Sequence, residues 1–205
     1  MDLLIESRRR RVYHVAGGVQ APASYLVVDP NIGGILVNAP AFSAGLLAKL
    51  QERAALRYIF LPSHLGARDL DAWRAATGAE ALAHGAERGL ISGTIDVALA
   101  AGSKLSRTID FLALPGRTPG TCAMRLRHRP AVVLFGPALS PGPSGWPTLV
   151  PAADDHSWEN RVIGALGLRG LRYDYALTDR FEPGRTRLGP GADRAVASEL
   201  AAALA

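Results

Sequence analysis

Cysteine is almost absent from this sequence, since Cys122 is the only one in 205 residues. A single cysteine excludes an intrachain disulfide and the cysteine-rich kinds of zinc site. Long apolar runs are also missing, because no stretch reaches the roughly 20 residues that a membrane helix needs. The first residues combine acids with arginines and have no apolar segment behind them, unlike a signal peptide. We therefore expect a cytoplasmic protein that has no membrane span.

Acidic residues are outnumbered by basic ones, so the net charge is +5 and the sequence pI is about 9.9. The most basic stretch is Arg8–Arg11. No aromatic residues interleave with it and no RNA-binding signature follows, so we expect a solvated lead-in to the first strand rather than a nucleic-acid site. A hydrophobic content of 48% argues against disorder and is enough for a single domain over residues 1–205.

Hydrophobic periodicity predicts a repeated order of elements: strands, helix, strand, helix, and then the same again. Expected strands lie at 11–15, 24–28, 34–37, 58–61, 80–83, 94–100, 104–107, 109–114, 121–127, 131–135 and 173–177, with helices near 43–55, after 70, after 157 and at the end. Two similar halves of this kind favour two face-packed sheets with helices outside.

One loop stands out in this pattern. An apolar strand at 58–61 is followed by a segment that contains His64. Asp69 then precedes a helical pattern whose N-terminus it could cap. Loops between a strand and a helix are where α/β enzymes place their functional residues. The segment resembles the T-H-x-H-x-D-H metal-binding loop of the metallo-β-lactamase superfamily. In that comparison His64 is the first His, while Gly66, Arg68 and Asp69 stand at the second His, the Asp and the last His.

Other positions follow the same resemblance. The segment P-G-R-T-P-G at 115–120 is similar to the family's P-G-H-T-P-G, with Arg117 in place of a metal-binding His. Asn38 stands where the family has an Asp that supports the metal loop, and Pro137 stands where an Asp bridges two metals. Asp179 is the expected occupant of the final His position.

The resemblance implies an α/β (α+β) fold, a four-layer αββα sandwich of two mixed β-sheets, and a hydrolase with two metal ions. Zinc needs three or four N, O or S donors, and arginine, glycine and proline side chains supply none. We therefore expect a metallo-β-lactamase-like fold with a degenerate metal site, no active metallohydrolase and no cofactor. The residues of this relic site, expected to converge at one end of the sandwich, are Asn38, His64, Arg68, Asp69, Arg117, Pro137 and Asp179.

Three alternatives remain open. The first is a module that binds a small anionic ligand with Arg68 and Arg117, beneath the Pro/Gly-rich loop 136–151. The second is a hydrolase with one weak zinc ion on His64, Asp69 and Asp179. The third is a structural partner or homodimer.

A purely structural role is also expected for each of these residues. His64 is expected to hydrogen-bond to backbone or to Asp69, and Asp69 to act as a helix N-cap. Arg117 is expected to pair with Asp69 or Asp179, since a buried cation balances buried acids. His156 is expected to be only a polar residue near a helix start. Tyr13, Trp73 and Trp146 are expected to serve packing.

Overall fold

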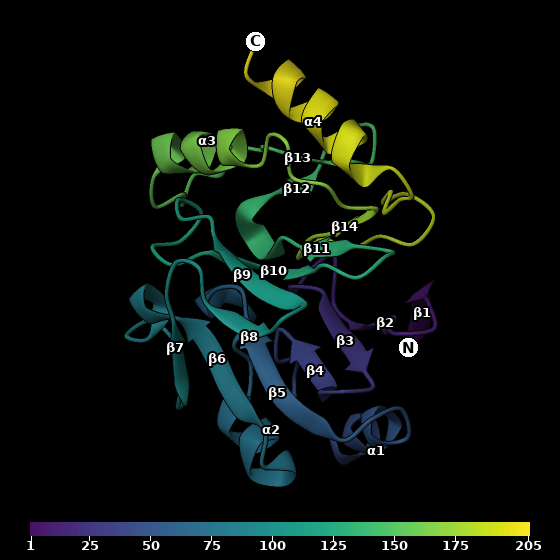
Figure 1. Ribbon diagram of the computed structural model, residues 1–205. Coiled ribbons are helices and arrows are strands. Elements are labelled where there is room, and N and C mark those ends of the chain that lie inside the picture. Colours follow the sequence, from purple (N-terminus) through teal and green to yellow (C-terminus); the bar gives the residue numbers. More distant parts are fainter. The chain divides into compact units, whose positions relative to one another are not determined.

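The computed structural model describes all residues, 1–205, and divides them into two compact units, Met1–Leu99 and Ala100–Ala205. The division falls between the two halves that the repeated element order predicted. Each unit contains a mixed β-sheet and two α-helices, as Figure 1 shows. None of the four α-helices is both long and apolar enough to span a bilayer. The expectation of one domain over 1–205 stays a prediction.

The first unit is built on a seven-stranded sheet. In order across the sheet, its strands are β1 (Asp2–Glu6), β2 (Arg11–Ala16), β3 (Ser24–Asp29), β4 (Gly33–Val37), β5 (Leu56–Leu61), β6 (Glu80–His84) and β7 (Val97–Leu99). Strands β1 to β4 pair antiparallel and β4 to β7 pair parallel. The parallel part requires crossovers, which α1 (Ala44–Gln51) and α2 (Leu70–Thr77) supply. The carboxyl ends of β4, β5 and β6 therefore share one edge of the sheet.

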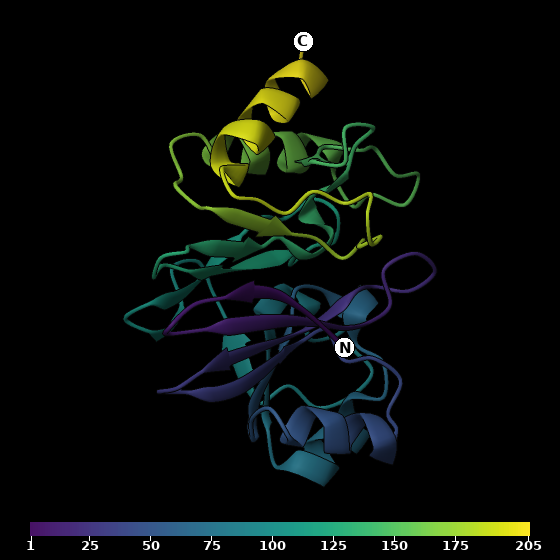
Figure 2. The ribbon, with the colours of Figure 1, turned by 90° about the vertical axis from the view of Figure 1, so that its right-hand side faces the viewer.

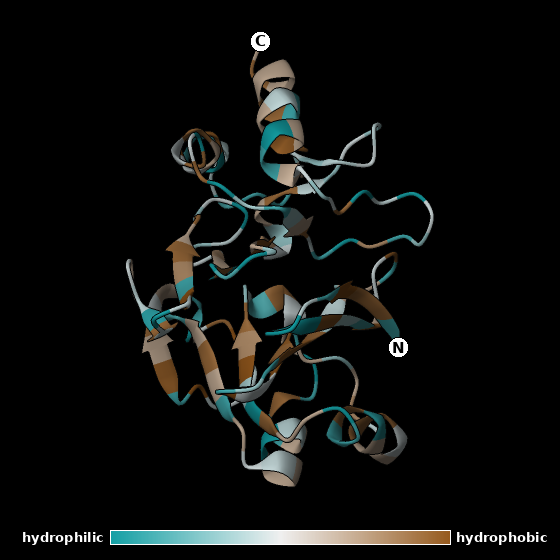
Figure 3. Cartoon of the chain, turned by 45° about the vertical axis from the view of Figure 1, so that its right-hand side comes forward, coloured by the Kyte–Doolittle hydropathy of each residue, from teal (hydrophilic) through white to brown (hydrophobic).

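Both helices of this unit pack on the same face of the sheet, which Figure 2 shows from the side. The core beneath them includes Leu36, Leu50, Ile59 and Trp73, all fully buried. In Figure 3 the strands of the sheet are largely brown, the colour of hydrophobic residues. Burial of this apolar face is the main stabilising contribution to the unit.

The second unit has a five-stranded sheet in the order β14 (Tyr175–Leu177), β11 (Val132–Leu134), β10 (Cys122–Leu126), β9 (Ile109–Ala113) and β8 (Lys104–Ser106). Its helices are α3 (Trp158–Gly167) and α4 (Ala192–Ala203), which share one apolar core with the sheet. The expected alternation in β10 is confirmed, because Cys122, Met124 and Leu126 are buried while Arg125 and Arg127 reach solvent.

The Pro/Gly-rich loop 136–151 is less irregular than expected. It contains a short helical turn, η3 (Gly136–Ala138), and a two-stranded ribbon of β12 (Ser140–Pro141) and β13 (Pro147–Thr148). The Thr148 hydroxyl donates to the backbone carbonyl of Glu199 in α4, at 3.2 Å. Within its own unit, the loop is thus fastened to a helix.

The arginine run is not a lead-in to the first strand, because strand β1 precedes it. Residues 7–10 form the turn between β1 and β2, in which the Ser7 hydroxyl accepts from the backbone N–H groups of Arg9 and Arg10. Arg10 is buried, and its Nε donates to Asp29 Oδ2 at 2.6 Å. Sequence reasoning missed β1 because acids at both ends of Asp2–Glu6 obscure the strand pattern.

One carboxylate connects two strands of the second sheet. Asp110 on β9 accepts from Nε and Nη2 of both Arg125 and Arg127 on β10, at 2.5–3.2 Å. Burial of the carboxylate opposes its ionisation, but the hydrogen bonds from the two guanidinium groups outweigh it and lower the pKa of Asp110 to about 2. The ionised carboxylate is therefore a stabilising feature of the β9–β10 pair.

This pKa predicts a pH dependence of stability. A carboxyl whose folded pKa lies below its unfolded value of about 3.9 stabilises the fold above that pH and loses the contribution as pH falls toward 2. We expect wild type to exceed Asp110→Asn in free energy of unfolding by roughly 2 kcal/mol near neutral pH, with the difference shrinking between pH 4 and pH 2. Denaturant unfolding of both proteins across this range measures it, and a difference that does not change with pH would contradict the assignment.

Candidate functional site

The first group of candidate residues lies where β4 and β5 end. Their loops are joined by backbone hydrogen bonds: Asn38 N–H donates to the Phe60 carbonyl, Ala39 N–H to that of Gly66, and Arg68 N–H to that of Ala39, at 2.8–3.0 Å. The Asn38 side-chain amide donates to the Ala23 carbonyl at 2.8 Å. These bonds hold the His64 loop against the end of β4.

Gly66 lies so close to Asn38 that no side chain fits there. A Cβ on Gly66 would stand 1.9 Å from Asn38 Oδ1. Asn38 itself has a left-handed backbone with φ of 59°, which asparagine tolerates better than most residues. The position that the sequence resemblance assigned to a second His is thus closed by packing, and a histidine could enter only if Asn38 moved.

His64 is held by a carboxylate that sequence reasoning did not identify. Glu87, in the helical turn η2 (Gly85–Glu87) after β6, is fully buried, and its Oε2 lies 2.6 Å from His64 Nδ1. The same oxygen accepts the His64 backbone N–H at 2.7 Å. The expected partners, backbone or Asp69, are therefore wrong. A proton on Nδ1 leaves Nε2 as the nitrogen with a free lone pair.

Asp69 is at the N-cap position of α2 but does not cap it. Its backbone is left-handed, with φ of 48°, and its side chain makes no hydrogen bond to the first turn of the helix. Instead Oδ2 accepts the backbone N–H of Phe42 at 3.0 Å. A second hydrogen bond also joins α2 to the β4–α1 loop, because Trp73 Nε1 donates to the Pro40 carbonyl at 2.8 Å. The expected N-cap position is thus confirmed, but the carboxylate holds the β4–α1 loop and not the first turn of the helix.

A pocket of about 200 Å³ lies beside these loops, within the first unit. It is lined by small and apolar residues from the β2–β3 loop, the β4–α1 loop, α1 and the His64 loop; these are Ala16, Gly17, Ala21, Pro22, Asn38, Ala39, Pro40, Ala41, Leu46, Leu65, Gly66 and Arg68. Arg68 is the one charged residue among them. It is exposed, and its guanidinium group has no carboxylate partner.

The second group of candidate residues lies in the second unit, where β9, β11 and β14 end. Phe135 N–H donates to the Leu177 carbonyl and Asp179 N–H to the Gly136 carbonyl, at 2.7 and 3.0 Å. These bonds place Asp179 beside the turn that contains Pro137. Both residues are buried.

Arg117 is paired with acids other than the expected ones. Its Nη2 donates to Asp154 Oδ2 at 2.8 Å and its Nη1 to the Asp154 carbonyl at 3.0 Å, while its Nε lies 3.7 Å from Asp155 Oδ1. Asp155 in turn accepts from the buried Arg161 of α3 at 2.7–2.8 Å. A hydrogen bond from the Arg117 side chain lowers the pKa of Asp154.

The glycine-rich turn at 115–120 is packed directly on the start of α3. A Cβ on Gly116 would stand 2.5 Å from the Arg161 backbone nitrogen, and Ser157 N–H donates to the Gly116 carbonyl at 2.8 Å. Ser157 is the N-cap of α3, with its hydroxyl accepting from Asn160 N–H. His156 lies just before it and is exposed, as expected of a polar residue near a helix start.

The structure therefore brings Asn38, His64, Arg68 and Asp69 together in one unit, and Arg117, Pro137 and Asp179 lie in the other. The convergence of all seven residues stays a prediction. Neither unit contains a group of three or more His, Cys, Asp or Glu side chains placed to hold a metal ion. The residues present do not fit the zinc site of the family, because Gly66 is closed by packing and Arg117 supplies a cation in place of a donor.

Comparison with solved structures identifies the fold. The BLEG-1 B3 metallo-β-lactamase has a TM-score of 0.72 and 13% identity over 90% of this chain and 96% of that one. The DIM-1 metallo-β-lactamase exposed to ceftazidime has a TM-score of 0.70 and 14% identity over 99% and 98%. BJP-1, a subclass B3 enzyme of Bradyrhizobium japonicum, has a TM-score of 0.65 and 17% identity over 97% and 91%. The chain thus has the metallo-β-lactamase fold predicted from its sequence.

No family model and no curated protein sequence matches this chain.

The close approach of Gly66 to Asn38 predicts a large effect of a small change. Gly66→Ala should destabilise the protein by roughly 1–3 kcal/mol, because the new methyl group forces apart two loops that are hydrogen-bonded to each other. Gly45→Ala is the matched control, since a Cβ there meets nothing within 4 Å. In that helix the change should stabilise by up to about 1 kcal/mol. Denaturant unfolding of both variants tests this, and an unchanged midpoint for Gly66→Ala would show that the loops yield freely.

Proposed function

We propose that this protein uses the metallo-β-lactamase fold without metallohydrolase chemistry and binds a small molecule. The main support for the loss of metal chemistry is the close packing of Gly66 against Asn38. It leaves no room for a metal-binding side chain at the position that the resemblance assigned to a His. The identities of Arg117 and Pro137 support the same conclusion. The Arg117 guanidinium has no lone pair to give a metal, and Pro137 has no side-chain donor.

The pocket beside Arg68 indicates what such a protein would bind. Its lining is mostly small and apolar, and its one charged residue, Arg68, is exposed and has no carboxylate partner. Binding sites typically combine an apolar wall with a few polar groups that orient the ligand. We infer a ligand with an apolar body and one anionic group, held by a charge-assisted hydrogen bond from Arg68.

One observation favours the alternative of a weak mononuclear zinc site. A metal-binding histidine usually gives its other ring N–H to a carboxylate, which orients the ligating nitrogen. The buried Glu87 stands in that relation to His64 Nδ1. Against it, Asp69 Oδ2 accepts the Phe42 N–H and holds the β4–α1 loop.

Metal content separates these two functions. We expect protein purified without added zinc to hold no stoichiometric zinc, iron or manganese, and to show no turnover of lactams, thioesters or phosphodiesters. Metal analysis and a hydrolase panel with and without chelator measure this. Near-stoichiometric metal, or chelator-sensitive turnover that His64→Ala abolishes, would establish the zinc alternative.

Ligand binding is the second measurable consequence. A thermal-shift series of small carboxylic acids, with the matching alcohols, should show stabilisation by the acids alone. A ligand at ten times its Kd stabilises by about 1.4 kcal/mol, which raises the melting temperature by about 3–6 °C. Arg68→Gln should remove the shift, whereas Arg57→Gln, an exposed arginine of the same unit, should keep it. Equal shifts in all three proteins would place binding outside this pocket.

A further inference from the structure

The positive charge of this chain is concentrated in one place. The first unit has ten basic and nine acidic residues, while the second has thirteen and nine. Five of those thirteen lie in β8 and β10 and the turns that follow them, and we call them the β8–β10 cluster: Lys104, Arg107, Arg125, Arg127 and Arg129. Asp110, on the intervening strand β9, is the one acid in β8, β9 and β10. The rest of the unit has eight residues of each sign, so its excess charge comes from this cluster.

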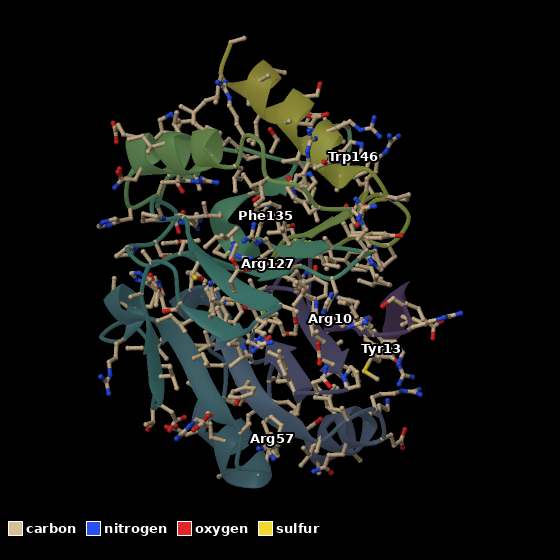
Figure 4. All side chains as sticks on the ribbon, in the orientation of Figure 1. Arg10, Tyr13, Arg57, Arg127, Phe135 and Trp146 are labelled. Atoms are coloured by element: carbon tan, nitrogen blue, oxygen red, sulfur yellow. The ribbon has the colours of Figure 1, made fainter.

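Strand pairing places these residues close together. Lys104 on β8, Asp110 on β9 and Arg125 on β10 are direct partners across three neighbouring strands. Arg127 N–H donates to the Thr108 carbonyl at 2.9 Å, which joins the β10 end to the β8–β9 turn. Arg107 and Arg129 lie in the two turns at this end of the sheet. Figure 4 labels Arg127, which lies by β10.

Asp110 fixes two of these cations without neutralising the cluster. It accepts from Nε and Nη2 of both Arg125 and Arg127, so the two guanidinium groups are held side by side by one negative charge. Lys104, Arg107 and Arg129 are exposed and have no carboxylate partner. The next acid along the sheet, Asp174, accepts the Ala131 N–H at 2.7 Å. The cluster therefore has two cations fixed on Asp110 and three without a carboxylate partner, toward one end of the sheet.

The chemistry of the cluster fits a chain of phosphates. The planar guanidinium group of arginine can donate two hydrogen bonds to phosphate oxygens. Cations on three neighbouring strands span roughly 10 Å, which is about the length of three base-pair steps of 3.4 Å along a duplex. A membrane surface fits less well, because none of the large exposed hydrophobic residues lies between residues 100 and 149 to enter a bilayer. No exposed aromatic ring accompanies the cluster to stack on bases, which favours contact with the backbone alone.

We propose that the β8–β10 cluster binds the phosphodiester backbone of nucleic acid, independently of base sequence. The cluster shares no residue with the lining of the Arg68 pocket and does not depend on the function proposed for that pocket. The expectation against nucleic acid came from the run at Arg8–Arg11, where one arginine is buried on Asp29. The cluster is not a run in the sequence, since its members span 26 positions and meet through strand pairing.

The test is the salt dependence of binding to labelled duplex DNA. Fluorescence anisotropy with two unrelated duplexes of about 20 base pairs, at about 50–200 mM salt, gives the slope of log K against log salt, about −0.9 per phosphate contact. We expect equal affinity for both sequences. Arg107→Gln/Arg129→Gln should weaken binding to both alike and reduce the slope by about two. Neither arginine makes an ion pair, so the folded state should be unaffected, as circular dichroism will show.

The matched control removes the same charge elsewhere. Arg8→Gln/Arg9→Gln lies at the exposed β1–β2 turn and should leave affinity and slope near those of wild type. An equal loss in both double variants would reduce the effect to net charge and overturn the proposal. An absence of duplex binding at the lowest salt would also overturn it. The same holds if the protein prefers anionic lipid vesicles to duplex and Arg107→Gln/Arg129→Gln abolishes the vesicle binding.

Discussion

The contact on which the candidate site depends is the approach of two backbone segments that leave neighbouring parallel strands. After β4 and β5 the chain is joined by hydrogen bonds between Ala39 and Gly66 and between Arg68 and Ala39. The approach is possible only because residue 66 has no side chain and because Asn38 accepts a left-handed backbone. Asp69 and Trp73 extend the same join by binding the Phe42 N–H and the Pro40 carbonyl. Polar groups that could serve a metal instead hold loops together.

The second unit uses charge for a similar purpose. An ionic series joins the turn at 115–120 to α3, with cations and carboxylates in alternation. Its order in space is Asp154, Arg117, Asp155 and Arg161. Arg161 also donates to the carbonyls of Val150 and Ala138, which ties both ends of the loop 136–151 to the helix. The buried members of this series, Asp155 and Arg161, need each other as partners, since an isolated buried charge is strongly unfavourable. Arg117, which the sequence resemblance set in place of a metal-binding His, is thus part of the structure of its unit.

Much of the fold followed from local patterns. Alternation in β10, the apolar run of β11 and the two crossovers around β5 are short-range signals, and the turn P-G-R-T-P-G is distinctive enough to point to one fold. The weak elements were those with mixed patterns, such as β1, or with proline and glycine throughout, such as the ribbon β12–β13. Glu87 had one available signal: it follows the strand next to the His64 loop, where a buried carboxylate can reach the same edge. The acid pair Asp154-Asp155 just before an N-cap was a similar clue.

By itself the sequence determined which side chains can donate to a metal and which cannot, because the chemistry of Gly66, Arg117 and Pro137 does not depend on their surroundings. It also determined the order of most strands and helices, β1 and the ribbon β12–β13 excepted, because hydrophobic periodicity encodes them within a few residues. Only the tertiary structure decided the partners. His64 meets Glu87 across 23 residues, Arg117 meets Asp154 across 37, and Arg125 and Arg127 share Asp110. Such pairings depend on which strand ends are neighbours and on approaches of a few ångström, and neither quantity is present in a linear pattern.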